Sequence, residues 1–171
     1  MTILEQLNAT RSRLLSELDG LSDEQLNWKP DDSTWSIAQV VQHIAMGESG
    51  IVQPILLGLA QNPTFTPKNL PLDHLLLDRS RKVNAPERLH PSTEPKTVGK
   101  LKEILHNSRE KFLDVLSRVE DSSLLDKTSP PVPHPAFGEL STRQWIQFGI
   151  LHEARHILQI EELKKRFQSD R

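Results

Sequence analysis

Two histidines and a glutamate lie close together near the C-terminal end of the chain, in the stretch "HEARH" at residues 152–156. His152 and His156 are one helical turn apart, so on a helix both imidazoles lie on the same face and can reach one metal ion. The stretch also fits H-E-x-x-H, in which a zinc protease uses both histidines as ligands and the glutamate as base. The spacing therefore predicts a metal site and raises the question of whether the protein is a protease.

The residues after the motif do not complete a protease. The long form of the zinc-protease pattern requires a glycine and a further histidine beyond the second histidine, and those positions hold Gln159 and Glu162. Glu161 and Glu162 continue the same predicted helix, so neither can fold back to a metal held by His156. No strand is predicted that could hold an extended peptide. We therefore expect a third protein ligand to come from upstream.

A third histidine, His43, lies in the middle of another apolar helical segment. Gly47 and Gly50 share its face of that helix, and they either leave open space beside the imidazole or allow another helix to pack closely. Facing the pair from the last helix, His43 would complete three nitrogen ligands and leave a position for water, as in catalytic zinc sites. The alternative is that all three are hydrogen-bonded histidines of the core or surface. His134, in a proline-rich loop, is a candidate for the rim of such a pocket.

Glu153 directly follows the first histidine of the pair. A carboxylate in that position can act as a base toward metal-bound water, or it can order a hydrogen bond to a ligand. The alternative is a surface salt bridge, for example with Arg155 or with a lysine on another helix. The sequence leaves both interpretations open, and Glu153 is a candidate catalytic residue.

Four segments have the apolar periodicity of amphipathic helices, and three of them begin with a capping box. They span residues 3–19, 36–60, 97–119 and 141–167. Long proline-rich connections without a convincing strand follow the second and third segments, at residues 61–96 and 126–139. Long amphipathic segments without alternating ones predict an all-α fold, a four-helix bundle with long proline-rich crossover loops.

The composition narrows the class of protein. The chain has 171 residues, of which 36% are hydrophobic and 26% charged, and its net charge is -2. These values predict a single globular domain over residues 1–171. No basic block marks a nucleic-acid site, and no stretch has the apolar run of a signal peptide or a membrane span. The absence of cysteine leaves His, Asp and Glu as metal ligands and fits a cytoplasmic protein.

The sequence resembles the DinB-like superfamily in two stretches, "TWSIAQVVQHIAMGE" and "HPAFGELSTRQWIQFGILHEARHILQIEEL". The resemblance extends over nearly the whole chain and includes "KVNAPERLHPS" in the middle crossing. It implies a four-helix bundle with a divalent metal held by one histidine of the second helix and a histidine pair of the last. These ligands carry over onto His43, His152 and His156. In this family an acidic residue often follows the first histidine of the pair, so "HEARH" matches the protease pattern by coincidence.

The resemblance leaves the reaction open, because the family contains thiol-dependent S-transferases, a thiol-dependent isomerase and proteins described only as metal-dependent hydrolases. We expect a hydrolase or thiol S-transferase that activates water or a low-molecular-weight thiol for a small-molecule substrate. Zinc or nickel is the expected ion, since imidazole suits both. The alternative is a non-catalytic metal-binding or stress-response interaction protein. Family members are often dimers, and a last helix that is apolar on several sides agrees with a homodimer.

Overall fold

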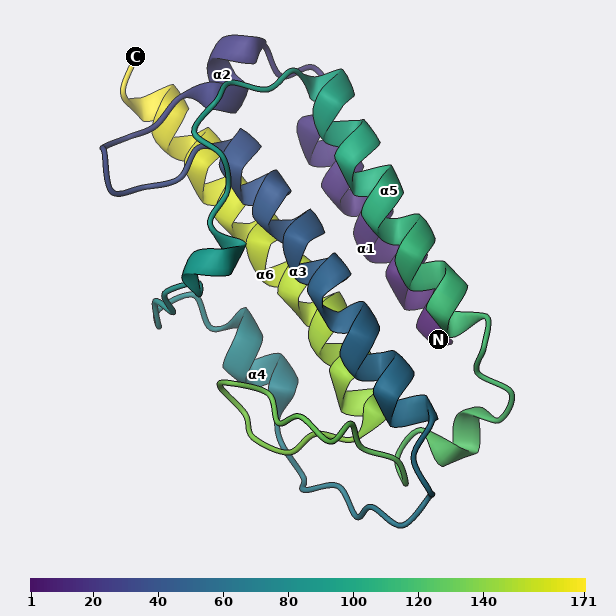
Figure 1. The fold of residues 1–171 in the computed structure, drawn as a ribbon. Coiled ribbons are helices and arrows are strands. Elements are labelled where there is room, and N and C mark those ends of the chain that lie inside the picture. Colours follow the sequence, from purple (N-terminus) through teal and green to yellow (C-terminus); the bar gives the residue numbers. More distant parts are fainter.

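Four long helices form a bundle in the computed structural model, which describes all 171 residues (Figure 1). They are α1 (Ile3–Leu18), α3 (Ile37–Leu59), α5 (Val98–Leu116) and α6 (Thr142–Ser169). The connections contain the short helices α2 (Asp23–Asn27) and α4 (Leu72–Leu77) and the 3-10 turns η1 (Glu87–Leu89) and η2 (Ser122–Leu124). There is no strand, so the predicted all-α four-helix bundle is confirmed, with boundaries that differ from the predicted ones by less than one helical turn.

Each long helix begins at a side-chain cap that the sequence encodes. Thr2, Ser36 and Ser141 each accept a hydrogen bond from the backbone N–H three residues on, and the Glu or Gln at that position accepts one in return. Thr97 caps α5 in the same way without the return bond. These bonds satisfy N–H groups that have no partner inside the helix, so they fix where each helix begins. The two helices that carry the predicted ligands, α3 and α6, therefore both start at a defined residue.

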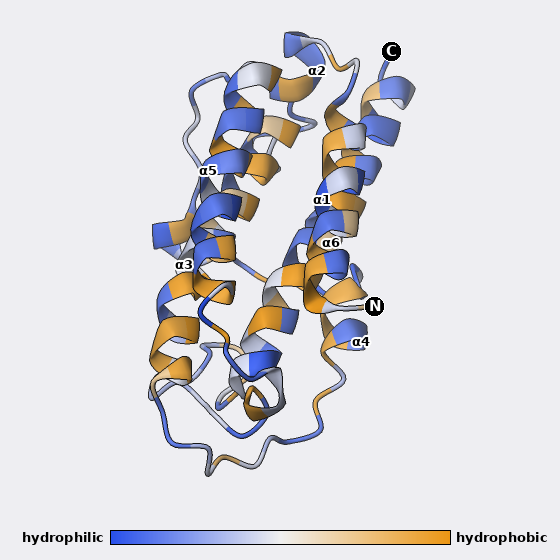
Figure 2. Ribbon diagram, turned by 90° about the vertical axis from the view of Figure 1, so that its right-hand side faces the viewer, coloured by the Kyte–Doolittle hydropathy of each residue, from blue (hydrophilic) through white to orange (hydrophobic).

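Helix α3 packs between α5 and α6, and α6 also packs against α1 (Figure 1). Figure 2 shows that the apolar residues face the space between the helices while hydrophilic residues cover the outside. Two apolar clusters fill the interior, one around Val41 and Ile160 and the other around Phe112 and Ile146. The crossing from α3 to α5 brings α4 against α6 and η1 against α3. None of the helices combines the length and the apolar character that a membrane crossing requires.

Two arginines join α1 to α5 through reciprocal hydrogen bonds. Arg11 on α1 donates from Nη1 to the carbonyl oxygen of Leu105 on α5 at 2.7 Å. Arg109 on α5 donates from Nη1 to the carbonyl oxygen of Leu7 on α1 at 2.9 Å. Both guanidinium groups are buried. The interior of the bundle is therefore polar where these two side chains cross between α1 and α5.

A third buried arginine holds the long crossing onto α6. Arg155 donates hydrogen bonds to the backbone carbonyls of Leu76, Asp78 and Arg81, at distances of 2.6 to 2.9 Å. These three bonds attach the end of α4 and the following turn to the part of α6 that lies between the two predicted histidine ligands. The crossing therefore has a fixed position beside the candidate site.

Candidate metal centre

The three histidines selected from the sequence meet between α3 and α6. Nε2 of His152 lies 3.1 Å from Nε2 of His43 and 3.2 Å from Nε2 of His156. The ligand atoms of all three residues lie within 4.8 Å of one another, and no Asp or Glu belongs to this group. His43 and His156 are buried, and His152 is partly exposed. The structure thus brings together side chains from two helices that are distant in the sequence.

Two of the imidazoles are oriented by acceptors at their outer nitrogens. Nδ1 of His43 donates to the carbonyl oxygen of Leu89 at 2.9 Å, and Nδ1 of His156 donates to Oε1 of Gln159 at 2.7 Å. Because a neutral imidazole has a single N–H, both rings must carry their hydrogen on Nδ1. Their Nε2 lone pairs therefore point at the centre of the cluster. Metal-binding histidines are commonly oriented by such partners.

The distances and donor types fit a divalent cation. Only His152 can carry a hydrogen on its Nε2, so the three facing Nε2 atoms share at most one hydrogen. At least two of these nitrogens therefore present lone pairs to the centre. Two imidazole nitrogens at about 2.0–2.1 Å from a tetrahedral zinc ion lie about 3.3 Å apart. The observed separations of 3.1 and 3.2 Å are close to that value. A cation at the centre would remove the repulsion between the facing lone pairs.

Burial lowers the pKa of all three imidazoles. Desolvation is the largest cause for His43, and it lowers the pKa of His156 to about 3. The pKa of His152 lies well below its ordinary value because the ring is desolvated and lies beside His156 and His43. A histidine with a lowered pKa is neutral at physiological pH, and the neutral imidazole is the form that binds metal.

Gly47 allows the imidazole of His152 to approach the backbone of α3. A Cβ atom added to Gly47 would lie 2.7 Å from Cε1 of His152, whereas one added to Gly50 would meet nothing within 4 Å. The two glycines therefore differ in what they do. Gly47 allows α3 and α6 to approach each other closely, and Gly50 borders open space.

Replacing Gly47 with alanine is expected to weaken zinc binding by about tenfold or more, because the added methyl group displaces the ring of His152 from its two partners. Gly50→Ala is the matched control, since its methyl group meets nothing within 4 Å. The zinc affinity of each variant is measured by competition with a chromophoric chelator, after circular dichroism shows equal helix content. Equal affinities in the two variants would show that this contact does not position His152.

Glu153 does not join the imidazoles but lies in a buried network of charges. Its oxygens accept hydrogen bonds from Arg11 at 2.9 and 3.2 Å and from Arg109 at 2.8 Å. Glu48 on α3 accepts from the same two arginines at 3.0 and 2.6 Å. Only 2% of Glu153 is exposed, and its carboxylate faces the two guanidinium groups. The salt bridge is buried and joins Glu153 to Arg11 and Arg109, so the predicted surface pair with Arg155 or a lysine is wrong, and the role of Glu153 as a base stays a prediction.

The network is electrically balanced, because two guanidinium groups face two carboxylates. Burial lowers the pKa of Arg11, but hydrogen bonding and charge from Glu153 and Glu48 outweigh this effect and raise the pKa above its ordinary value. Arg11 therefore remains charged inside the bundle. Sequence reasoning had not singled out Arg11, Arg109 or Glu48, although they connect three of the four long helices to Glu153.

Aromatic rings lie on both sides of the histidine cluster. The ring of Trp35 lies 5.0 Å from that of His43, and the ring of Phe148 lies 5.6 Å from that of His152. The ring of His134 packs against that of Phe148, with their centroids 4.4 Å apart. His134 does not belong to the group of ligands, and its predicted place at the rim of the site stays a prediction.

His134 is expected to make the protein less stable in acid. Burial lowers its pKa from 6.5 to about 4, so between these values the unfolded chain binds a proton that the folded chain does not. The titration of His134 therefore lowers the free energy of unfolding by about 2 kcal/mol as the pH falls from about 7 to about 4.5. The variant His134→Asn removes the titration and keeps an acceptor for the N–H of Ala136, which donates to Nδ1 at 3.1 Å. Urea unfolding at both pH values should show a smaller acid loss in this variant, and an equal loss would contradict the assignment.

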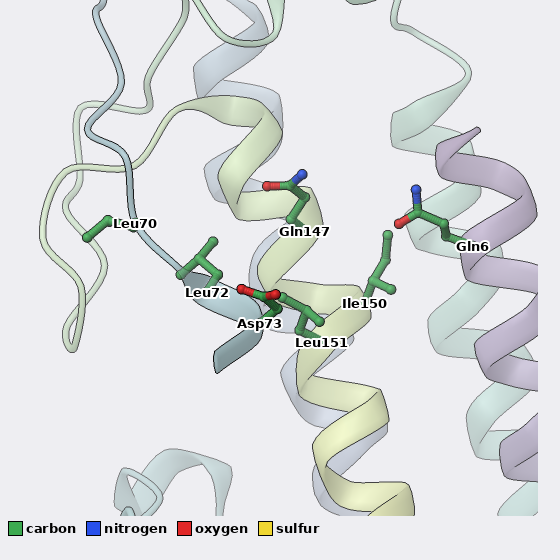
Figure 3. A pocket seen from close by; sticks show the side chains of 7 residues that line it. All are labelled: Gln6, Leu70, Leu72, Asp73, Gln147, Ile150 and Leu151. Carbon is green, nitrogen blue, oxygen red and sulfur yellow. The ribbon is translucent and has the colours of Figure 1, made fainter. Parts of the chain in front are cut away.

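The cavity in Figure 3 lies apart from the histidines, between α1, the start of α4 and α6. It has a volume of about 330 Å³, and Gln6, Asp73 and Gln147 are its polar lining residues. Leu72 and Ile150 are among its apolar ones. It contains no histidine, so it offers no ligand set comparable with the one between α3 and α6.

Residues 6–160 match the family model described as the DinB superfamily. The chain is also 31% identical over 161 residues to "uncharacterized protein YuaE" of Bacillus subtilis (strain 168). That alignment covers 94% of this chain and 96% of the relative. The similarity therefore extends over both helices that carry the histidines.

Two solved structures share the fold. One is TT2238, described as a four-helix bundle protein, with a TM-score of 0.60 and 19% identity over 94% of this chain and 96% of that one. The other is YfiT from Bacillus subtilis, described as a probable metal-dependent hydrolase with an unusual four-helix bundle topology. Its TM-score is also 0.60, with 17% identity over 97% of this chain and 86% of that one. At these identities the likeness shows the fold alone.

Proposed function

The chain belongs to the DinB superfamily, and from this premise we propose that it is a metal-dependent enzyme whose ion is held by His43, His152 and His156. The observation that carries the proposal is the convergence of the three Nε2 atoms, two of which must present lone pairs. A divalent ion held there would lower the pKa of a water molecule or a thiol and so supply a nucleophile at neutral pH.

The protein's own residues would hold the ligands and shape the site. The carbonyl of Leu89 and the amide of Gln159 fix the orientation of two imidazoles. Trp35 and Phe148 place aromatic rings beside His43 and His152. We assign Glu153 a structural role in place of a base, because its ion pairs tie α6 to α1 and α5 directly beside His152.

Hydrolysis or thiol S-transfer on a small molecule is the reaction class that we propose. The description of YfiT as a probable metal-dependent hydrolase supports the first. Zinc or nickel as the ion is supported by the three imidazole ligands. A homodimer is supported by exposed leucines on α1 and α4, namely Leu4, Leu75 and Leu77. The absence of cysteine agrees with a cytoplasmic location.

Cobalt(II) substitution tests whether the site has a position for a nucleophile. The visible spectrum of cobalt-loaded protein is recorded while azide or 2-mercaptoethanol is added. We expect the spectrum to change with at least one of them, because three protein ligands leave a coordination position open. A response to the thiol and not to azide would favour S-transfer. A spectrum unchanged by both ligands would contradict the enzyme and favour a non-catalytic metal-binding protein.

A further inference from the structure

A second cavity, of about 520 Å³, lies where η1 meets α3 and α5. We call it the α3–α5 groove, and its lining includes Met46, Ser49, Arg88, Leu89, Asn107 and Lys111. We propose that this groove binds a small organic anion, a phosphate or carboxylate that carries an apolar group. The proposal goes beyond the metal-dependent function and does not depend on it.

The charges that line the groove have one sign. Arg88 from η1 and Lys111 from α5 both line it, and no Asp or Glu does. Neither side chain forms an ion pair or a hydrogen bond within the protein, whereas most other arginines are paired. Glu87 and Glu110 are their neighbours in the sequence but do not line the groove. Two cations from different elements therefore face one cavity without a counter-charge, which is an arrangement that phosphates and carboxylates bind.

The remaining lining combines polar groups with an apolar surface. Ser49 and Asn107 offer a hydroxyl and an amide, and neither side chain has a hydrogen-bond partner in the protein. Gly50 keeps the α3 wall open, since a Cβ there would meet nothing within 4 Å. Met46 and Ile104 provide apolar surface. A few polar groups around an apolar surface are typical of small-molecule sites of this volume.

Two residues of the groove also bond to residues outside it, namely His43 and Glu48. Leu89 accepts the hydrogen bond from Nδ1 of His43 at 2.9 Å. Ser108 lines the groove and donates to Oε2 of Glu48 at 2.5 Å, within the network that holds Glu153. An anion in the groove would therefore contact one residue that is bonded to His43 and one that is bonded to Glu48.

Binding is tested with phenyl phosphate and phenylacetate, with benzyl alcohol as the uncharged control. Methyl NMR signals of Met46 and Ile104 are followed during each titration. We expect at least one of the two anions to shift these signals and the alcohol to have little effect. Replacing both Arg88 and Lys111 with glutamine should weaken the anion by about tenfold or more, because two charge-assisted contacts are lost. Replacing Lys82 and Lys165 with glutamine removes the same charge from exposed lysines elsewhere and should change nothing.

The titration is repeated on His156→Ala, because phosphates also bind metal ions and the hydrogen-bond partner of His156, Gln159, does not line the groove. The shifts at the groove should persist in that variant, which separates this proposal from the metal site. Binding of only one of the two anions supports the proposal and identifies the head group. Equal affinity in the Arg88/Lys111 double variant, or equal binding of benzyl alcohol, would overturn it.

Discussion

The variant Glu153→Gln is expected to lose about 3–5 kcal/mol of unfolding free energy, because it leaves two buried guanidinium groups with Glu48 as their one counter-charge. Arg11 and Arg109 both donate to this carboxylate, and all three side chains are at least nine-tenths buried. Removing one partner of a buried ion pair lowers the free energy of unfolding by more than the intact pair adds to it, because the remaining charge stays buried without water. Urea unfolding at neutral pH measures the loss.

Glu161→Gln is the matched control, because it makes the same substitution on the same helix. Glu161 pairs with Arg13 at the surface, so its loss should be below about 1 kcal/mol. The Glu153→Gln protein that remains folded should still bind one metal ion per chain, with the three histidines intact. A small stability loss together with abolished turnover would instead assign Glu153 the role of a base.

Zinc is expected to raise the melting temperature of the metal-free protein by about 10 °C. The ion binds the folded chain and not the unfolded one, so at about a thousand times its dissociation constant it adds about 4 kcal/mol. For a chain of this size each kcal/mol corresponds to about 2–4 °C. Differential scanning fluorimetry with and without zinc, after treatment with a chelator, measures the shift.

His106→Ala is the control for this experiment, because His106 is an exposed histidine on α5 outside the cluster. It should retain the full thermal shift. His43→Ala should lose most of it, since two histidines one turn apart hold a metal more weakly than three. A full shift in His43→Ala would mean that zinc stabilises the protein from another site.

The helices were largely predictable because their signals are local. Capping residues such as Ser36 and Ser141 fix the starts of α3 and α6, and the apolar periodicity fixes their length. The short elements α4 and η1 were missed, since they lie in a proline-rich crossing and are too short to show periodicity. Their positions depend on tertiary contacts, above all the hydrogen bonds from Arg155 to three backbone carbonyls.

The histidines of the candidate site could be selected by residue type and spacing, but their supporting contacts could not. The carbonyl of Leu89 orients His43, and a backbone carbonyl has no signature in the sequence. Gln159 lies three residues after His156 on the same helix, so its contact was within reach of a spacing argument.

The charge network gave a weak signal in the sequence. Arg11 lies between Leu7 and Leu14 on the apolar face of α1, where a charge must find a buried partner. Arg109 follows the break in the apolar pattern of α5 at Ser108. Which carboxylates these arginines pair with depends on how the helices pack, and the sequence of one helix does not contain that information.

Metal content tests the central claim most directly. Protein purified without a histidine tag is analysed by inductively coupled plasma mass spectrometry, with wild type, His43→Ala and His106→Ala prepared in parallel. We predict about one divalent ion per chain in wild type and His106→Ala, because His43, His152 and His156 form a single group of ligands. We predict little or none in His43→Ala. Equal metal content in His43→Ala and wild type, or no metal in wild type even after incubation with zinc and nickel, would contradict the three-histidine centre.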